Sequence, residues 1–323
     1  MGRFGHIVNA VILVILLCLS GQFSRAESYD FEYQKSIDVG GSAKLEIINS
    51  QGDIKIEGAP VDRITVSAIK HVRATDPDEA EEIADHIEIK AGRSGDQIRI
   101  EVRFLKMTRT SDSFWKKLFG TGPDSFGSVD FQISVPYYCE LDVDNTTGNI
   151  YVNNLDNNIR MASASGEIEI NGIEGDIDIA GTGANVLLRS VQGNSDIRTT
   201  TGNVEAQDYF GDIKVKSTSG DITLYQESGS HELATHSGDV RVKTELNSDK
   251  EFRVETDTGR IFFSVPTTAS GSVKLETISG NINTELPLIV QQFSKNKLAG
   301  TFGHEGPKIL IESQSGDITL GQY

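Results

Sequence analysis

Apolar and polar residues alternate with a period of two in short runs between residues 145 and 243. Each run follows a turn of the form Gly-Asp or Gly-Asn, and its two core positions lie two and four residues after the Gly position. Twenty of the 22 residues at these core positions are apolar, and the exceptions are Ser195 and His231. Such alternation, rich in β-branched residues, predicts short strands with one buried face.

The turns recur every nine residues without a slip. Their Gly positions are residues 148, 157, 166, 175, 184, 193, 202, 211, 220, 229 and 238. Units preceded by small polar residues alternate with units that carry an apolar residue two positions before the Gly, so the full period is 18 residues. Strands this short cannot bury an apolar face alone, whereas stacked coils bury a continuous core. We therefore expect an all-β solenoid over residues 137–323, with two strands and two turns per coil.

Copies of the unit also occur outside this block. One isolated copy spans residues 49–56, and later copies begin at Gly259, Gly280 and Gly316. The wider spacing of the later copies predicts longer connections between coils. The longest, Gln291 to Gly306, is polar and Gly-rich without sustained alternation, and we expect a loop there.

An insert separates the isolated copy from the main block. Asp76 followed by Pro77 predicts a helix start, with Glu79 closing a capping box, and the helix should run to about His86. The strands expected around the helix are 63–74, 87–89, 97–104 and 129–135. We expect this α/β insert, within an N-terminal region of residues 27–136, to cover one open end of the solenoid.

The Ser-Gly-Asp-Ile units, the predicted helix and the strand 130–136 before the repeats together resemble the putative-adhesin β-strand-repeat family of bacterial envelope proteins. The resemblance extends over about residues 44–320 as one continuous domain. It implies a right-handed, parallel, single-stranded β-helix and a location in the cell envelope. It supplies no catalytic or cofactor-binding residues.

The N-terminus has the features of an export signal. A largely apolar run of 14 residues, Ile7 to Ser20, follows a short polar start, and Ser24 to Ala26 offer small residues for cleavage. The run is shorter than the roughly 20 residues that a membrane-spanning helix needs. We therefore expect residues 1–26 to be a signal peptide and the protein to reach the periplasm, the cell surface or the medium; an uncleaved anchor is the alternative.

Net charge excludes one class of partner. The chain carries 30 Lys and Arg residues against 47 Asp and Glu residues, a formal net charge of −17. Phosphate contacts need a basic surface, so we expect no nucleic-acid binding. Without residues 1–26 one cysteine remains, Cys139, which we expect to be a small buried side chain.

Three candidate chemistries stand beside simpler structural interpretations. The Gly-Asp turns invite comparison with calcium-binding nine-residue repeats, but many units carry Asn, so turn formation is the simpler role. Acids 18 residues apart should stack, as Asp178 does over Asp196, and such ladders occur in polysaccharide-cleaving β-helices. His231 and His236 are spaced by five residues, which places them on opposite faces of a strand and favours a core position for His231. We expect no metal and no cofactor.

The most unusual stretch is basic and aromatic. It spans residues 103–119, with five basic residues and one acid, and contains the single Trp of the chain. Basic and aromatic side chains together suit an anionic membrane or a partner protein. The candidate contact residues are Phe114, Trp115, Lys116, Lys117 and Phe119. The alternative is a loop whose aromatic side chains pack on the insert.

These observations favour a non-enzymatic envelope protein, an adhesin-like or scaffold solenoid that binds a protein, a glycan or a membrane surface. Two alternatives stay open: a polysaccharide-active β-helix enzyme and a calcium-stabilised secreted module. A surface groove that gathers Asp, Arg and aromatic side chains on neighbouring coils would favour the enzyme.

Overall fold

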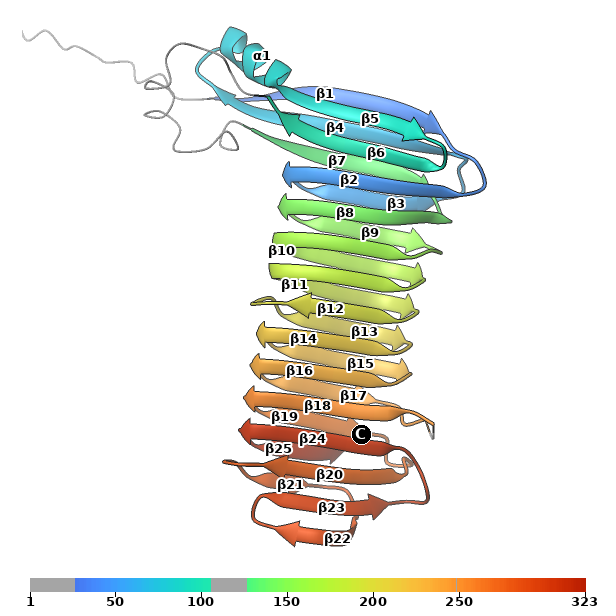
Figure 1. The fold of residues 1–323 in the computed structure, drawn as a ribbon, viewed down its shortest axis with the longest axis vertical. Coiled ribbons are helices and arrows are strands. Elements are labelled where there is room, and N and C mark those ends of the chain that lie inside the picture. Colours follow the sequence, from blue (N-terminus) through green and yellow to red (C-terminus); the bar gives the residue numbers. More distant parts are fainter. Residues whose placement is uncertain (1–26, 106–126, 248) are drawn as a thin grey trace, which may run out of the picture.

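The structure is a computed structural model that describes residues 27–105, 127–247 and 249–323. Within these ranges it is an elongated stack of β-strands with one helix, α1, at one end (Figure 1). The prediction of an all-β fold with a helix in the N-terminal insert is confirmed. No helix in the described ranges is long and apolar enough to span a membrane.

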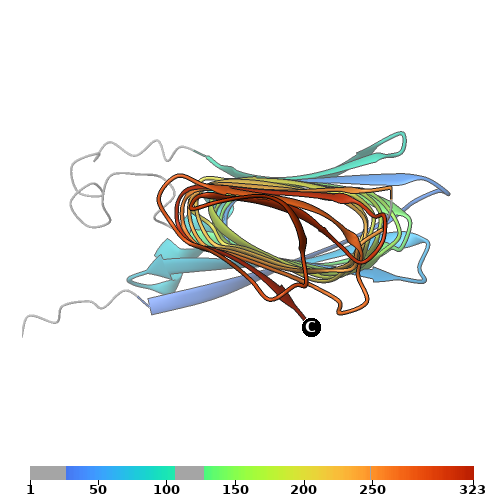
Figure 2. The same ribbon diagram turned by 90° about the horizontal axis from the view of Figure 1, so that it is seen from below.

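Each coil contributes one strand to each of two faces, and seen along the axis the coils superimpose as a flattened ring (Figure 2). In order along the axis, face 1 consists of β5 (Ile87–Ser94), β6 (Gln97–Phe104), β2 (Ala43–Gln51), β8 (Cys139–Thr147), β10 (Ile159–Glu174), β11 (Ile177–Gln192), β12 (Ser195–Thr199), β14 (Ile213–Ser219), β16 (His231–Ser237), β18 (Glu251–Thr258), β24 (Lys308–Ser315), β20 (Gly271–Thr277), β23 (Lys297–Phe302) and β22 (Ile289–Ser294).

Face 2 is built in the same way. In order along the axis, it consists of β1 (Glu27–Asp38), β4 (Arg63–Ala74), β7 (Gly127–Pro136), β3 (Ile54–Ala59), β9 (Ile150–Leu155), the second halves of β10 and β11, β13 (Val204–Phe210), β15 (Ile222–Ser228), β17 (Val240–Thr244), β19 (Ile261–Val265), β25 (Ile318–Gln322) and β21 (Ile282–Thr284). β10 and β11 bend around a corner and so belong to both faces.

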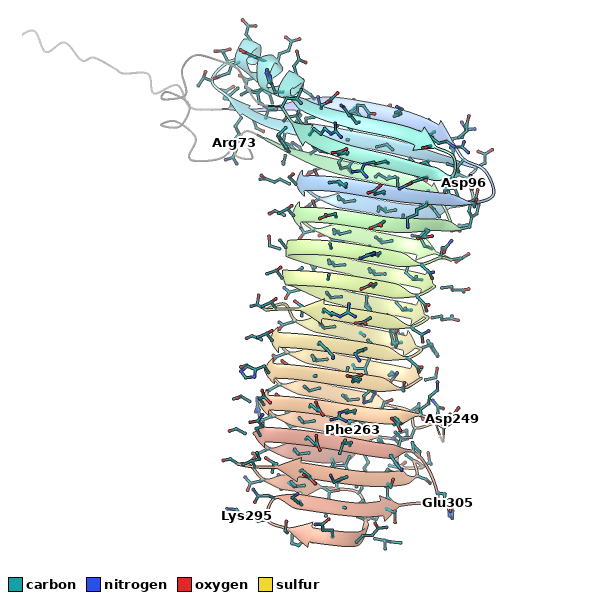
Figure 3. The ribbon with its side chains drawn as sticks, viewed as in Figure 1. Arg73, Asp96, Asp249, Phe263, Lys295 and Glu305 are labelled. Atoms are coloured by element: carbon teal, nitrogen blue, oxygen red, sulfur yellow. The ribbon has the colours of Figure 1, made fainter. Side chains whose placement is uncertain are left out.

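Neighbouring coils pair in parallel and in register. Within the main block the paired residues are 18 apart, as in Ile159 with Ile177 and Val204 with Ile222. The inward residues of both faces form one core that runs the length of the stack, and Leu45, Ile170 and Leu320 are all completely buried in it. Phe263 lies between the two faces (Figure 3).

At both ends the order of coils in space differs from their order in the chain. The coil β2–β3 lies between β6–β7 and β8–β9, so the isolated repeat at residues 49–56 is in register with the main block. Strand pairing is therefore continuous across residue 136, where β7 ends. At the other end the last coil, β24–β25, is inserted between β18–β19 and β20–β21.

The insert lies at the N-terminal end of the stack (Figure 1). α1 (Pro77–His86) begins where predicted, and the Asp76 carboxylate accepts the backbone N–H of Glu79 at 2.9 Å. The predicted capping box is wrong in one partner: the Glu79 carboxylate accepts the backbone N–H of Thr75 at 2.8 Å, not that of Asp76. α1 buries Ala80, Ile83 and Ala84.

The prediction of a loop from Gln291 to Gly306 is wrong, because most of this segment lies in the antiparallel hairpin β22–β23. β23 does alternate, with Leu298 and Phe302 buried, but β22 is exposed along its whole length. A strand with no buried face needs no period-two pattern, so β22 has no signal in the sequence.

Polar residues occupy two of the core positions because each has a polar partner across the core. The Tyr209 hydroxyl, from face 2, donates to Ser195 Oγ at 2.8 Å on face 1. The imidazole of His231 is fully buried, with Nδ1 2.9 Å from Gln226 Oε1 and the rings of Phe252 and Phe263 beside it. The two partners come from adjacent strands of face 2, because Tyr209 on β13 pairs with Gln226 on β15.

Candidate functional site

A groove of about 850 Å³ runs along the axis of the stack on face 1, beside one row of turns. Its first wall is the column of residues that follows the turn position: Glu140, Asn158, Asp176, Asn194, Asp212, Ser230 and Glu251. Its second wall is the outward column two residues further on: Arg160, Asp178, Asp196, Lys214, Glu232 and Arg253. Between the walls the chain turns inward at core residues such as Ile177 and Ile213.

Parallel register creates both walls. Asp178 pairs with Asp196, Asp196 with Lys214 and Lys214 with Glu232, each one coil further along the stack. Adjacent strands in a sheet lie about 4.8 Å apart, so each wall presents one side chain at that interval. The acidic stack predicted at residues 178 and 196, with Lys214 beyond, is therefore part of the second wall.

Most charges of the second wall are compensated by a neighbouring side chain. Arg198 contacts Asp196 and lies 3.6 Å from Asp178. Lys214 Nζ lies 2.5 Å from Glu232 Oε2. Arg160 is exposed and forms no ion pair or hydrogen bond with the described residues, so its guanidinium is available at one end of the groove.

Two carboxylates of the groove have lowered pKa values. Burial alone would raise the pKa of Asp212, but the backbone N–H of Ser230 and the ammonium of Lys250 lower it overall. The hydrogen bond from Lys214 lowers the pKa of Glu232. A general acid needs the opposite shift, so these two groups are suited to holding a ligand by charge and hydrogen bonds rather than to donating a proton.

The groove has only part of the composition expected for a polysaccharide-cleaving β-helix. Asp and Arg side chains gather on neighbouring coils, but none of the groove's lining residues is Phe, Tyr or Trp. Aromatic platforms that would stack on sugar rings are therefore not part of its wall. The groove presents a polar, mixed-charge surface.

The turn residues are engaged by the backbone of the next coil. Asp221 Oδ1 accepts the backbone N–H of Asp239 at 2.8 Å, and Asn203 Oδ1 accepts that of Asp221 at 2.9 Å. On the other row of turns, Asp176 Oδ1 accepts the N–H of Asn194 at 2.9 Å. Asp and Asn are interchangeable in this role because both offer Oδ1, which is why the repeat accepts either residue.

The two histidines of the predicted pair lie apart, as their spacing indicates. His231 is in the core, and burial lowers its pKa to about 3. His236 is exposed and contacts Asp257. Among the residues that the structure describes, no three His, Cys, Asp or Glu side chains are arranged to hold a metal ion. Cys139 is buried, and burial raises the pKa of its thiol to about 12.

The predicted contact residues, Phe114 to Lys117 and Phe119, lie outside the described residues, as do residues 1–26. The groove was not predicted as a site, although its signal was present in the sequence. Its second wall is the position three residues after the Gly in every second unit, and that position is charged in Asp178, Asp196 and Lys214.

The sequence profile of one protein family, Toastrack DUF4097, matches residues 42–321. None of the curated proteins matches the chain. Solved structures give low-identity matches that extend over nearly the whole chain. A "putative lipid binding protein" from Parabacteroides distasonis is 13% identical, with a TM-score of 0.46, and the match covers 90% of this chain and 96% of that one.

Two further structures match at lower TM-scores. A "putative cell adhesion protein" from Clostridium sporogenes is 13% identical, with a TM-score of 0.28 and coverage of 91% of this chain and 100% of that one. A "putative adhesin" from Bacteroides fragilis is 12% identical, with a TM-score of 0.28 and coverage of 90% and 97%. The matched range of the family agrees closely with residues 44–320, over which the sequence resembles an adhesin-like family.

Proposed function

The chain belongs to the Toastrack DUF4097 family, and we propose that it is an exported, non-enzymatic, adhesin-like protein that holds a linear glycan in the groove on face 1. Export rests on the signal features of residues 1–26, with the periplasm or the cell surface as the destination. The right-handed winding of 18-residue coils is part of the same proposal. It rests on the family resemblance and on the 18-residue register of the main block.

One observation carries the choice of ligand: the two walls of the groove repeat in step along the axis. A polymer lying along the groove meets an equivalent pair of wall positions at every coil, about 4.8 Å apart. The groove crosses the strands, whose backbone groups are already paired within face 1, so a peptide has no free strand edge to join there. Hydroxyl groups of a glycan can use the carboxylate, amide and ammonium groups of both walls.

Charge narrows the class of glycan. The groove is lined by seven acidic residues and three basic ones, within a chain of formal charge −17. This excess of negative charge opposes an anionic polymer such as a polyuronate. We therefore propose a neutral or amine-bearing glycan, whose ammonium groups could pair with carboxylates such as Asp178.

The test is a calorimetric titration of the purified protein with neutral, glucosamine-type and uronate oligomers of equal length. We expect binding of a neutral or amine-bearing oligomer and none of the uronate. The double variant Asp178→Asn/Asp196→Asn should weaken binding at least tenfold, and Arg160→Ala should weaken binding of a neutral oligomer at least tenfold. The matched control is the double variant Glu169→Gln/Arg189→Ala, which removes an ion pair on face 2.

Any of three results would overturn the proposal. The first is equal loss of affinity in the control on face 2, which would move the contact away from the groove. The second is no binding of any of the three oligomer classes. The third is turnover of a bound oligomer by the protein, which would favour the enzyme.

The basic and aromatic segment at Phe114–Phe119 remains a second proposed contact, for a partner protein or a membrane. Its test is a pull-down from solubilised cell envelope. The comparison is between the protein and a variant that replaces Phe114, Trp115, Lys116 and Lys117 by Ser. A partner captured by both would place the contact elsewhere.

A further inference from the structure

The C-terminal end of the stack carries an apolar strand, β22, that no other part of the described chain covers. In β22 the side chains of Ile289, Val290 and Phe293 are 70%, 52% and 78% exposed, and Ile278 nearby is 73% exposed. We call these four residues the terminal patch. They are among the most exposed large apolar side chains of the described chain, and Figure 1 shows β22 as the last strand of the stack.

β22 also has one free edge. It pairs with β23 and with no other strand in the described ranges. The backbone N–H and C=O groups on its other edge therefore lack a strand partner. Exposed edges of this kind pair readily with another strand unless charge, proline or a covering element prevents it.

Two apolar side chains of β22, Val290 and Phe293, face the interior of the stack, whereas Ile289 lies opposite Thr301 and points outward. Phe293 lies opposite Leu298 and Val290 opposite Gly300, so both point to the side on which Leu298 is buried. Face 2 ends at the three-residue strand β21, whose one partner among the described strands is β25. β22 thus extends beyond face 2, and its inner side chains stay exposed, whereas those of β23 are buried.

The two ends of the stack differ in charge. The edge strand β1 at the N-terminal end contains Glu27, Asp30, Glu32, Lys35 and Asp38. By contrast, residues 286–294, which include β22, contain no charged residue in a chain of formal charge −17. The basic side chain of Lys295 lies at the turn that follows β22 (Figure 3). The C-terminal edge is therefore where two acidic copies can approach with the least repulsion.

We propose that the terminal patch is the interface of a homodimer, in which β22 pairs antiparallel with β22 of a second copy. A two-fold axis beside the free edge places β22 of one copy antiparallel to β22 of the other. The free backbone N–H and C=O groups of each copy can then form hydrogen bonds with those of its partner. Face 1 then continues through both copies, and the overhanging side chains of Val290 and Phe293 are covered from both sides. A lipid surface could cover the side chains but would leave the edge N–H and C=O groups unpaired in hydrocarbon.

The closed symmetry limits the assembly to two copies. The N-terminal edge strands, β1 of face 2 and β5 of face 1, both carry charges that protect them from pairing, so the second copy offers no further edge of the same kind. The dimer is a single rod with a groove on each half and the two N-terminal regions at its far ends. This arrangement doubles the number of grooves without changing either one.

The test is the molar mass of the purified protein over a range of concentrations, measured by sedimentation equilibrium. We expect a dimer whose dissociation constant rises at least tenfold in Phe293→Lys, which puts a charge in the terminal patch, and in Val290→Pro, which removes a backbone N–H and an exposed apolar side chain from β22. The matched control is Phe210→Lys, because Phe210 is also exposed but lies on face 2 within the stack. The control should leave the dissociation constant unchanged.

A cross-linking experiment distinguishes this interface from any other. Gln292→Cys places a thiol in the middle of β22, and under oxidation it should link two copies; the wild type and Gln34→Cys on β1 should not. Three results would overturn the proposal: a monomer at every concentration, a dimer that Phe293→Lys does not weaken, or binding to phospholipid vesicles that Phe293→Lys abolishes.

Discussion

Asp53 Oδ1 accepts the backbone N–H of Asn149 at 2.8 Å, although 96 residues separate them in the chain. The N–H of Asp53 in turn donates to Asp130 Oδ1 at 2.9 Å. The side chain of Asp53 thus links the early repeat to the main block, and the backbone N–H of Asp53 links the same repeat to the insert. The three parts of the chain meet in one row of turns.

Replacing Asp53 tests how much this link contributes. Asp53→Ala leaves the N–H of Asn149 without its acceptor, and we expect the free energy of unfolding to fall by about 1–2 kcal/mol. Asp53→Asn keeps Oδ1 and should cost much less, because Asn fills the same role in other units. Urea denaturation of both variants and of the control Asp144→Ala, at an exposed position of β8, measures the difference. Equal loss in the Asn and Ala variants would show that the acceptor is not what matters.

The repeat is readable from sequence because each unit obeys a local rule. A Gly turn followed by two inward apolar residues fixes strand position, face and register at once, and parallel stacking of equal units then follows. Ser195 breaks the local rule, yet it too can be explained within the repeat, since Tyr209 lies on the opposite face of the same coil with its hydroxyl directed to Ser195.

The order of coils at the two ends could not be predicted, because it depends on contacts that no local rule encodes. The repeat at Gly316 pairs with Gly259, and the repeat at Gly280 pairs with Gly316 from the other side. Any two coils of the same length and pattern can stack, so the sequence alone does not distinguish these orders. The groove was not predicted, for a similar reason. The charged side chains of each wall come from different coils and become neighbours only when the coils stack.

The pH dependence of stability should contain a contribution from His231. Burial lowers its pKa to about 3, below the value of about 6.5 expected in the unfolded chain. A lowered folded-state pKa stabilises the fold above pH 6.5, and this stabilisation is lost as the pH falls toward 3. Between these two pH values the free energy of unfolding should fall by roughly 1 kcal/mol per pH unit, because His231 takes up a proton in the unfolded state but not in the folded state.

The measurement for His231 compares thermal unfolding of the wild type and His231→Leu from pH 7 to pH 4. Other carboxyl groups titrate in this range, so the informative quantity is the difference in slope between the two proteins. Gln226 Oε1 keeps the hydroxyl of Thr244 as a donor in the variant. Parallel curves for the two proteins would contradict a buried neutral imidazole, and His236→Leu serves as the exposed control.

His71 should act in the opposite direction. Its ring bridges β1 and β7 from β4, with Nδ1 2.7 Å from Asp30 Oδ1 and Nε2 3.1 Å from Asp130 Oδ2. Burial alone would lower its pKa, but the two carboxylates outweigh it and raise the pKa above the usual 6.5. The stabilisation is therefore complete below about pH 6.5 and is lost as the pH rises through the folded-state pKa.

An NMR titration of His71 checks this prediction directly. We expect a midpoint above 6.5 in the wild type and a lower one in both Asp30→Asn and Asp130→Asn. The melting temperature of His71→Gln should approach that of the wild type as the pH rises to 8.5. A wild-type midpoint below 6.5 would mean that desolvation, and not the two carboxylates, dominates the site.

Close stacking of the turns predicts which glycines the fold requires. A Cβ atom at Gly202 would lie 1.7 Å from the carbonyl oxygen of Ala184 on the preceding coil, whereas a Cβ at Gly92 would meet no atom within 4 Å. The atom that Gly202→Ala would strike belongs to the backbone, so the coils must separate locally. We expect that variant to lose about 1–3 kcal/mol of unfolding free energy, the cost typical of overpacking.

Gly92→Ala is the matched control, since it adds the same methyl group to a strand of the insert, and its effect should stay within about 1 kcal/mol. Urea denaturation of the two variants gives both values under one condition. Because the turns form a continuous row, the strain at Gly202 should spread to the adjacent coils and increase amide exchange at Ala184 and Gly220. Equal stability of the two variants would mean that neighbouring coils can move apart freely, and the in-step spacing of the groove walls would then have no rigid basis.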